Sequence, residues 1–150
     1  MTKQKCIVVD IDGTVANHDG IRHHHAYDKV HLDEPHQDII NLVQILQFAQ
    51  RQSEFDYDGF EILFVSGRPD SCEIQTIEWL NKYGIWSFPY TLHMRETGDY
   101  RPDFIVKKEI YDKHIEPFYD VWFALDDRDQ IVNMWRENGI RCLQVREGNF

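Results

Sequence analysis

The run Cys6-Ile7-Val8-Val9-Asp10-Ile11-Asp12-Gly13-Thr14 decides the fold of this 150-residue chain. Its first four residues are apolar and mostly β-branched, which is typical of a buried strand in a parallel sheet. Asp10 and Asp12 follow this strand with one apolar residue between them, so both side chains leave toward one face. Ligands of open α/β sheets bind outside the carboxyl ends of the strands. We therefore expect the two aspartates to lie at a ligand site.

The two aspartates also carry a chemical constraint. Two like charges about 4 Å apart repel by ~4 kcal/mol at an effective dielectric of 20, and something must offset that repulsion. A hard divalent cation, or a proton shared with a substrate, would do so. Asp10 and Asp12 are therefore a candidate nucleophile and general acid. The alternative is that they only cap a turn or a helix.

Strand patterns and helical patterns alternate along the rest of the chain. The expected strands are residues 5–10, 60–65, 90–94, 121–125 and 141–145, and the expected helices are 36–52, 69–83, 103–114 and 128–138. A polar segment rich in His, Asp and Gly covers residues 16–36. The alternation predicts βαβ units, and hence one α/β domain over residues 1–150 with a mostly parallel sheet flanked by helices.

Composition narrows the function classes. The net charge of −10 argues against sequence-independent nucleic-acid binding, which depends on clustered Lys and Arg, but not against an enzyme that grips only a strand end. No apolar run approaches the ~20 residues of a membrane span, so no membrane association is expected. Cys6, Cys72 and Cys142 are odd in number and far apart. They form neither a metal motif nor a disulfide framework, which favours the cytoplasm.

Polar side chains recur where successive strands are expected to end. Ser66, Gly67 and Arg68 follow the second strand, and Asp126 and Asp127 follow the fourth. The pair Lys107-Lys108 lies near the start of the intervening helix. Because the carboxyl ends of parallel strands meet at one edge, these groups are expected to converge with Asp10 and Asp12 on one crevice.

This order of motifs resembles the haloacid dehalogenase superfamily of phosphotransferases. A closer resemblance, to the 3′-phosphatase domain of bacteriophage-type polynucleotide kinase–phosphatase, rests on residues 65–68, 94–96, 98–103, 106–110, 125–128 and 134–136. It implies a Rossmann-like fold with a minimal cap domain or none. It also implies an enzyme that removes 3′-terminal phosphates from DNA or RNA ends. The sequence holds no Gly-x-x-x-x-Gly-Lys-Ser/Thr loop, so it resembles a free-standing phosphatase, or a phosphatase whose partner kinase or ligase is another chain.

The resemblance assigns the catalytic roles. Asp10 attacks phosphorus and forms an aspartyl-phosphate, while Asp12 protonates the leaving oxygen and then activates water. Lys107 pairs with Asp10 and neutralises charge as the phosphoryl group is transferred. The alternative for Lys107 and Lys108 is an exposed helix face.

The resemblance also implies a magnesium site and a substrate site. Mg²⁺ is expected on Asp10, the main-chain carbonyl of Asp12, and Asp126 and Asp127, and which of the last two binds directly is open. The expected substrate-binding residues are Ser66, Gly67, Arg68, Arg22 and Asp103, of which Asp103 orients Lys107 or Arg68. Helix capping is the alternative role for Asp103 and for Asp126.

The segments between motifs are too short for a large cap domain, since only about 38 residues separate Arg68 from Lys107. An open crevice suits a polymer end, which makes a Mg²⁺-dependent polynucleotide 3′-phosphatase the leading hypothesis, with 2′,3′-cyclic ends as a related substrate. Two alternatives stay open: a phosphatase of small phosphomonoesters such as nucleotides, and a non-catalytic interaction module. His23, His24 and His25 are consecutive and are not expected to converge on one ion; a mobile loop is the better expectation.

Overall fold

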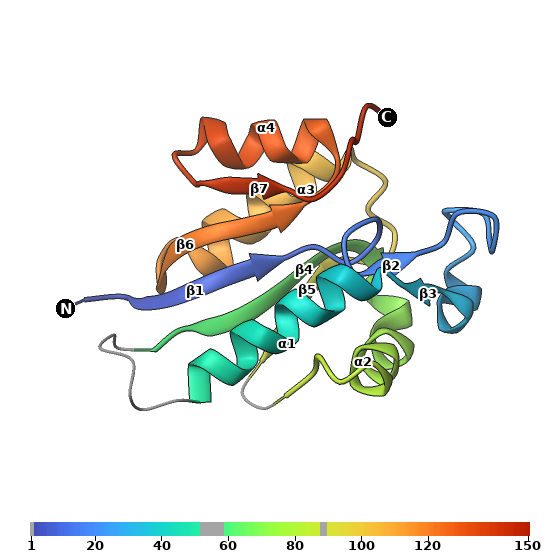
Figure 1. Ribbon diagram of the computed structural model, residues 1–150. Helices are drawn as coiled ribbons and strands as arrows, with labels where there is room; N and C mark the ends of the chain where they lie inside the picture. Colours follow the sequence, from blue (N-terminus) through green and yellow to red (C-terminus); the bar gives the residue numbers. More distant parts are fainter. Residues whose placement is uncertain (1, 52–58, 88–89) are drawn as a thin grey trace.

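The computed structural model describes residues 2–51, 59–87 and 90–150. A five-stranded parallel sheet runs through its centre in the order β5-β4-β1-β6-β7 (Figure 1). The strands are β1 (Gln4–Val9), β4 (Glu61–Pro69), β5 (Thr91–Arg95), β6 (Tyr119–Asp126) and β7 (Cys142–Gln144). The parallel sheet predicted from the sequence is therefore confirmed, with the Asp10 strand at its centre.

Helices cover both faces of the sheet (Figure 1). They are α1 (Gln37–Arg51), α2 (Glu73–Lys82), α3 (Asp103–Ile110) and α4 (Asp129–Glu137). Helices α1 and α2 pack on one face, and α3 and α4 on the other. Residue 52, the last expected residue of the first helix, lies outside the described residues.

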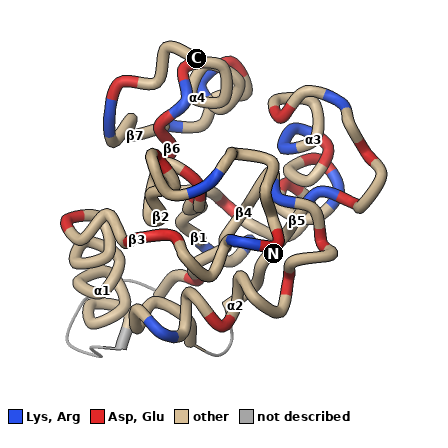
Figure 2. The backbone as a smooth tube through the Cα atoms, turned by 90° about the vertical axis from the view of Figure 1, so that its right-hand side faces the viewer, with Lys and Arg blue, Asp and Glu red and all other residues tan. Residues whose placement is uncertain are grey.

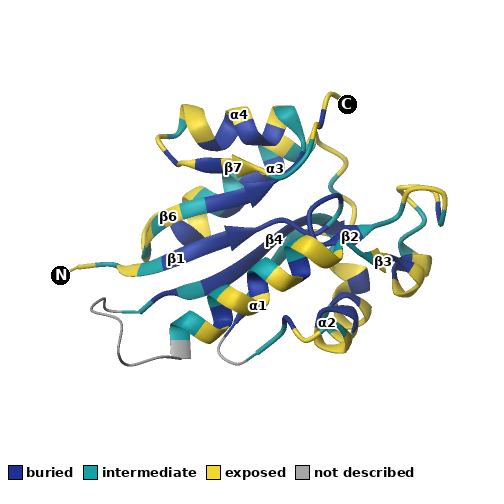
Figure 3. Cartoon of the chain, viewed as in Figure 1, coloured by how far each residue is buried: buried dark blue, intermediate teal, exposed yellow. Residues whose placement is uncertain are grey.

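Strand β1 supplies both hydrophobic cores because its side chains alternate. Ile7 and Val9 join the core under α1 and α2, whereas Cys6 and Val8 join the core under α3 and α4. All four are buried, and the middle strands are the most buried part of the ribbon (Figure 3). This double burial fixes the direction in which Asp10 leaves the sheet.

Several boundaries differ from those expected from the sequence, and those of β4, α2 and α3 differ most in the parts that adjoin the candidate site residues. Strand β4 continues to Pro69. Ser66, Gly67 and Arg68 are therefore among the last residues of the strand and do not form a loop after it. The pairing of β4 with β5 is irregular between Ser66 and Pro69, which allows the strand to continue past the motif. A 3₁₀ turn, Asp70–Cys72, then precedes α2. The helix expected over 103–114 is α3 followed by a π-helical turn, Tyr111–Ile115.

The polar segment before α1 is partly structured. It contains β2 (Ala16–Asn17), β3 (Glu34–Pro35) and the 3₁₀ helix η1 (Tyr27–Leu32), and β2 pairs with β3 in an antiparallel ribbon. This ribbon lies beyond the carboxyl ends of the strands (Figure 1). Within the described ranges no larger element stands over the sheet edge, and no helix has both the length and the apolar character to cross a membrane.

Candidate active site

The nucleophile candidate, Asp10, is held at the end of β1 by three hydrogen bonds. Its main-chain N–H donates to the carbonyl of Leu125 at 3.0 Å, which extends the pairing of β1 with β6. The Thr14 hydroxyl donates to Asp10 Oδ2 at 2.8 Å, and Lys107 Nζ donates to Oδ1 at 2.7 Å. The carboxylate is therefore fixed in one orientation by residues of β1's own loop and of α3.

A tight turn after β1 lets two other carboxylates approach Asp10. Gly13 lies in the left-handed region with φ +84°, and an added Cβ there would overlap the carboxylate of Asp127. Only glycine accepts both conditions. One oxygen from each of Asp10, Asp126 and Asp127 lies within 4.8 Å of the others, and all three residues are buried. The sequence-predicted convergence of the first and last motifs is thus present in the structure.

Lys107 is the cation inside this carboxylate cluster. Its ammonium donates to Asp126 Oδ2 at 3.0 Å as well as to Asp10, and the residue is 3% exposed. Burial alone lowers the pKa of Lys107, but the charges of Asp10 and Asp126 outweigh burial and raise it, so the side chain stays charged. Lys108, in contrast, points outward and pairs with Asp112.

One lysine does not balance three carboxylates. Burial and the charge of Asp126 raise the pKa of Asp10, and burial and the charge of Asp10 raise the pKa of Asp127 to about 6. Arg146 Nε donates to Asp127 Oδ2 at 3.2 Å, which partly offsets the repulsion. A crowded, buried, all-oxygen donor set of this kind fits a hard divalent cation.

The excess negative charge makes stability depend on pH. A carboxyl whose pKa is raised by folding contributes stability that is complete below the unfolded pKa and is lost as pH rises through the folded pKa. In a buffer containing a chelator, we expect the unchanged chain to lose free energy of unfolding relative to Asp127→Asn between pH 3.8 and about 6. Urea unfolding of both chains across this range measures the difference. A constant difference would contradict the assigned repulsion.

Asp12 lies on the other side of the site and has different partners. Arg68 donates to it from Nε at 3.1 Å and from one terminal nitrogen at 2.7 Å, and Arg22 donates at 3.2 Å. Burial opposes ionisation, but Arg68 and then Arg22 overcome it and lower the pKa of Asp12. The two arginines therefore meet at the candidate acid rather than in open solvent.

Asp33 is a member of the site that the sequence did not reveal. Its carboxylate accepts from Arg22 Nε at 2.7 Å and from a terminal nitrogen of Arg68 at 2.9 Å, and its side chain is fully buried. Trp79 Nε1 also donates to its main-chain carbonyl at 2.8 Å. In the sequence Asp33 precedes Glu34-Pro35 and reads only as a helix-opening residue. Arg146 was likewise missed, since nothing in the last strand pattern marks it.

The remaining substrate-binding candidates lie along the end of β4. Ser66 is buried and its Oγ accepts from the main-chain N–H of Arg68 at 3.1 Å. The carbonyl of Gly67 accepts from Arg95 Nε at 2.8 Å, and an added Cβ at Gly67 would lie 2.7 Å from a carboxylate oxygen of Asp103. Ser66 and Gly67 therefore border the site that Asp12 and Arg68 form.

Asp103 corrects the sequence-based assignment of its partners. It hydrogen bonds to Arg95 and, at 2.9 Å, to Arg128, and neither Lys107 nor Arg68 is a partner in the described residues. The reason is position. Asp103 opens α3 next to Arg95, the last residue of β5, and Arg128, which follows β6, whereas Lys107 lies one turn later and contacts the carboxylate cluster. Figure 2 looks onto this edge and shows acidic and basic stretches of backbone around it.

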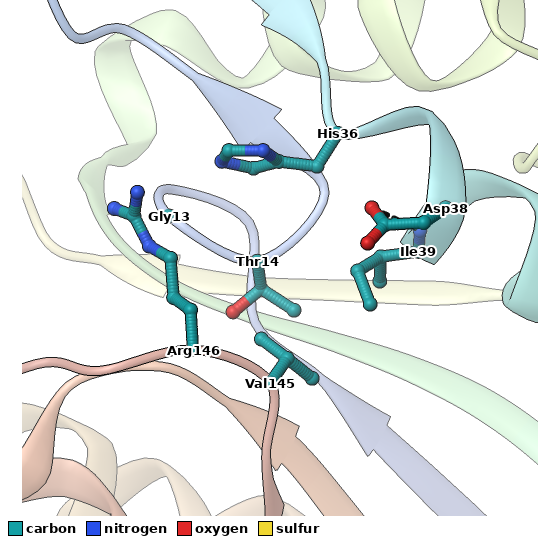
Figure 4. A pocket seen from close by; sticks show the side chains of 7 residues that line it. All are labelled: Gly13, Thr14, His36, Asp38, Ile39, Val145 and Arg146. Atoms are coloured by element: carbon teal, nitrogen blue, oxygen red, sulfur yellow. Dashed lines mark hydrogen bonds between the residues drawn. The ribbon is translucent and has the colours of Figure 1, made fainter.

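Two smaller features adjoin the site. A cavity of about 70 Å³ lies between the Gly13-Thr14 turn, the start of α1 and Arg146 (Figure 4). It has room for water molecules but not for a nucleotide.

The side chains of His23, His24 and His25 lie exposed in the loop after β2, and one ring nitrogen of each lies within 4.8 Å of the others. The expectation that consecutive histidines diverge is therefore wrong for this loop.

Comparison with known proteins adds family information to this geometry. The family model described as the polynucleotide kinase PNKP phosphatase domain matches residues 4–150. A protein of Autographa californica nuclear polyhedrosis virus, provisionally named a bifunctional polynucleotide kinase/RNA ligase, is 32% identical over 134 residues. That match covers 89% of this chain but only 18% of the viral protein.

Two solved structures are similar over the whole chain. A chain in the structure of the Pnkp1/Rnl/Hen1 RNA repair complex has a TM-score of 0.85 and 34% identity, covering 99% of this chain and 44% of that one. A chain in another structure of the Pnkp1/Rnl/Hen1 complex has a TM-score of 0.87 and 32% identity, covering 100% and 48%. This chain thus spans less than half the length of each of these relatives. Both the fold class and the resemblance predicted from the sequence are confirmed: the chain belongs to the family of PNKP phosphatase domains, within the haloacid dehalogenase superfamily.

Proposed function

We propose that residues 1–150 form one phosphatase domain that removes 3′-terminal phosphates from DNA or RNA ends with the aid of Mg²⁺. One observation carries this proposal. One oxygen from each of the buried carboxylates Asp10, Asp126 and Asp127 lies within 4.8 Å of the others, and the Lys107 ammonium donates to Asp10 and Asp126. Asp12, two residues after Asp10, pairs with Arg68 and Arg22. This arrangement supports the proposed roles of a nucleophile, a cation site, a general acid and two phosphate-binding groups.

The chemistry follows from the fixed orientation of Asp10. An oxygen of Asp10 attacks phosphorus, the bond from phosphorus to the 3′ oxygen of the nucleic acid breaks, and an aspartyl-phosphate forms. Asp12 gives its proton to the departing 3′ oxygen. In the second step Asp12 takes a proton from water, the water oxygen attacks phosphorus, and inorganic phosphate leaves Asp10 as a free carboxylate.

The arginines explain how Asp12 can change its protonation state. In the free protein Arg68 and Arg22 lower its pKa and keep it ionised. A terminal phosphate dianion competes for the same guanidinium groups, whose planar fork suits two phosphate oxygens. Once the arginines turn to the phosphate, the pKa of Asp12 rises and the residue can carry the proton. The buried carboxylate of Asp33 continues to pair with both arginines and keeps them beside the site.

Asp10, Asp126, Asp127 and the main-chain carbonyl of Asp12 are the groups that would hold Mg²⁺. The raised pKa values of Asp10 and Asp127 support this assignment, because a cation relieves the repulsion that raises them. When bound, Mg²⁺ supplies positive charge that offsets the repulsion between the carboxylates and the phosphate.

An open site supports a polymer substrate. Over the sheet edge, the described residues form the short β2–β3 ribbon, η1 and loops, with no larger helix or sheet that would enclose a small substrate. The solved relatives come from an RNA repair complex. We therefore propose nucleic-acid ends as the substrate and a separate kinase or ligase chain as the partner. The three buried free cysteines support a reducing, cytoplasmic setting.

Turnover of a 3′-phosphorylated oligonucleotide against a free 3′-nucleotide tests this function. We expect a higher kcat/KM for the oligonucleotide in the presence of Mg²⁺, and no turnover in the presence of a chelator. Equal values for the two substrates would favour a phosphatase of small phosphomonoesters. No turnover of either substrate would favour a non-catalytic module.

Replacing Arg68 by lysine is expected to lower kcat/KM by about 100-fold, because a lysine has no planar fork with which to hold Asp12, Asp33 and a phosphate. Steady-state kinetics on the oligonucleotide measures the effect. The matched control is Arg136→Lys, whose guanidinium donates to the Cys142 carbonyl away from the site. Similar kinetics for the two variants would remove Arg68 from the reaction.

A further inference from the structure

The histidine loop, His23-His24-His25, has a geometry that the reaction does not use. The ring centroids of His23 and His24 lie 4.2 Å apart, those of His24 and His25 lie 4.1 Å apart, and those of His23 and His25 lie 5.6 Å apart. One nitrogen from each ring lies within 4.8 Å of the other two. Three consecutive side chains thus point to one side of the chain.

Local hydrogen bonds produce this convergence. The main-chain N–H of His25 donates to His23 Nδ1 at 3.2 Å, and the N–H of Ala26 donates to the His23 carbonyl at 2.8 Å. The N–H of Tyr27 donates to the His25 carbonyl at 3.0 Å. The loop is therefore a sequence of tight turns, which folds neighbouring residues onto one face.

A buried arginine also holds the backbone of this loop. The buried Arg22 donates from one terminal nitrogen to the main-chain carbonyls of His23 and His24, at 3.3 and 3.2 Å. The rest of the same guanidinium is fixed by Asp33 and reaches Asp12. The buried ion pair of Arg22 with Asp33 therefore fixes the backbone that carries the imidazoles, beside the candidate active site.

Imidazole nitrogens select cations that the carboxylate cluster does not. Zn²⁺, Ni²⁺ and Cu²⁺ bind well to imidazole, whereas Mg²⁺ prefers oxygen. Three imidazoles with solvent on the open side match a four-coordinate zinc that keeps a water ligand. In the tautomer that accepts from the His25 N–H, His23 Nε2 carries the ring proton. A cation on Nδ1 would replace that hydrogen bond, and a cation on Nε2 would require the ring proton to move to Nδ1.

We propose that His23, His24 and His25 form a second metal site, which takes a transition-metal dication such as Zn²⁺ and is separate from the carboxylate cluster. This site does not depend on the proposed phosphatase activity, and its test measures binding alone.

Calorimetric titration of ZnCl₂ into the chain, made without a histidine tag and kept in excess Mg²⁺, tests the site. We expect one zinc per chain in the unchanged protein and about 100-fold weaker binding in the variant His23→Asn, His24→Asn, His25→Asn, which lacks every proposed ligand. Two controls are His31→Asn, an exposed histidine of η1, and Asp127→Asn. Both should bind zinc as the unchanged chain does.

Two results would overturn the proposal: undiminished binding by the triple variant, or loss of binding in Asp127→Asn, which would place the zinc among the carboxylates. Imidazole NMR signals of the unchanged chain give a measurement that needs no variant. Zinc should shift the ring signals of His23, His24 and His25 and leave those of His31 in place; the reverse pattern would contradict the site.

Discussion

Asp10→Asn should reduce turnover of a 3′-phosphorylated oligonucleotide by at least about 10⁴-fold, because Asp10 is the proposed nucleophile and an amide oxygen is a poor one. The fold should survive, since an amide keeps the shape of the side chain. Its single oxygen can still accept from Lys107, and the Thr14 hydroxyl can turn to accept from the amide NH2. Single-turnover kinetics with labelled substrate measures the loss, and circular dichroism checks the fold.

The matched control for this variant is Asp120→Asn. Asp120 belongs to β6, as Asp126 does, but lies near the strand's amino end and contacts Lys5 at 3.9 Å. Its loss should leave turnover unchanged. Near-normal turnover by Asp10→Asn would mean that another residue is the nucleophile.

Lys107→Met should destabilise the protein by about 3–5 kcal/mol, because it removes the buried cation that Asp10 and Asp126 share and leaves their charges unpaired. Turnover should also fall, by about 10²–10³-fold, since charge developing on the transferred phosphoryl group loses its nearest cation. Urea unfolding and steady-state kinetics measure the two effects.

The effect of pH on the stability of Lys107→Met distinguishes the loss of the buried charge from a packing defect. With the lysine removed, the pKa values of the carboxylates rise further, so acidification from neutral pH should restore part of the lost stability by protonating them. Mg²⁺ should do the same at constant pH. Lys108→Met, the exposed neighbour, should change neither quantity. A Lys107→Met protein as stable as this control would contradict the role assigned to the buried ammonium.

The sheet and the acidic half of the site were predictable because they follow from local pattern. A β-branched run ending in Asp-x-Asp-Gly-Thr predicts a buried parallel strand, a turn and two carboxylates at its carboxyl end. The rule that parallel strands share a carboxyl edge then brings in Asp126 and Asp127. Lys107 followed from the order of motifs that the family resemblance supplied.

The basic half of the site was less predictable because its partners are set by tertiary contacts. Asp33 precedes a proline and resembles a helix-opening residue, yet it is the buried counter-charge of Arg22 and Arg68. Asp103 lies one helical turn before Lys107, but two arginines from other elements capture it first. Sequence spacing predicts which residues are neighbours on one helix. It does not predict which side chains from other elements compete to pair with them.

Strand β1 pairs with a strand on each side, and this affects how the protein unfolds on heating. We expect a strand bonded on both edges to exchange its amide hydrogens only when the whole domain opens, so Asp10, the proposed nucleophile, should follow the part of the molecule that melts last. The histidine loop, held mainly by short turns and one arginine, belongs to the part that opens first. Thermal inactivation should therefore coincide with global melting, while any zinc bound outside the sheet is released at a lower temperature.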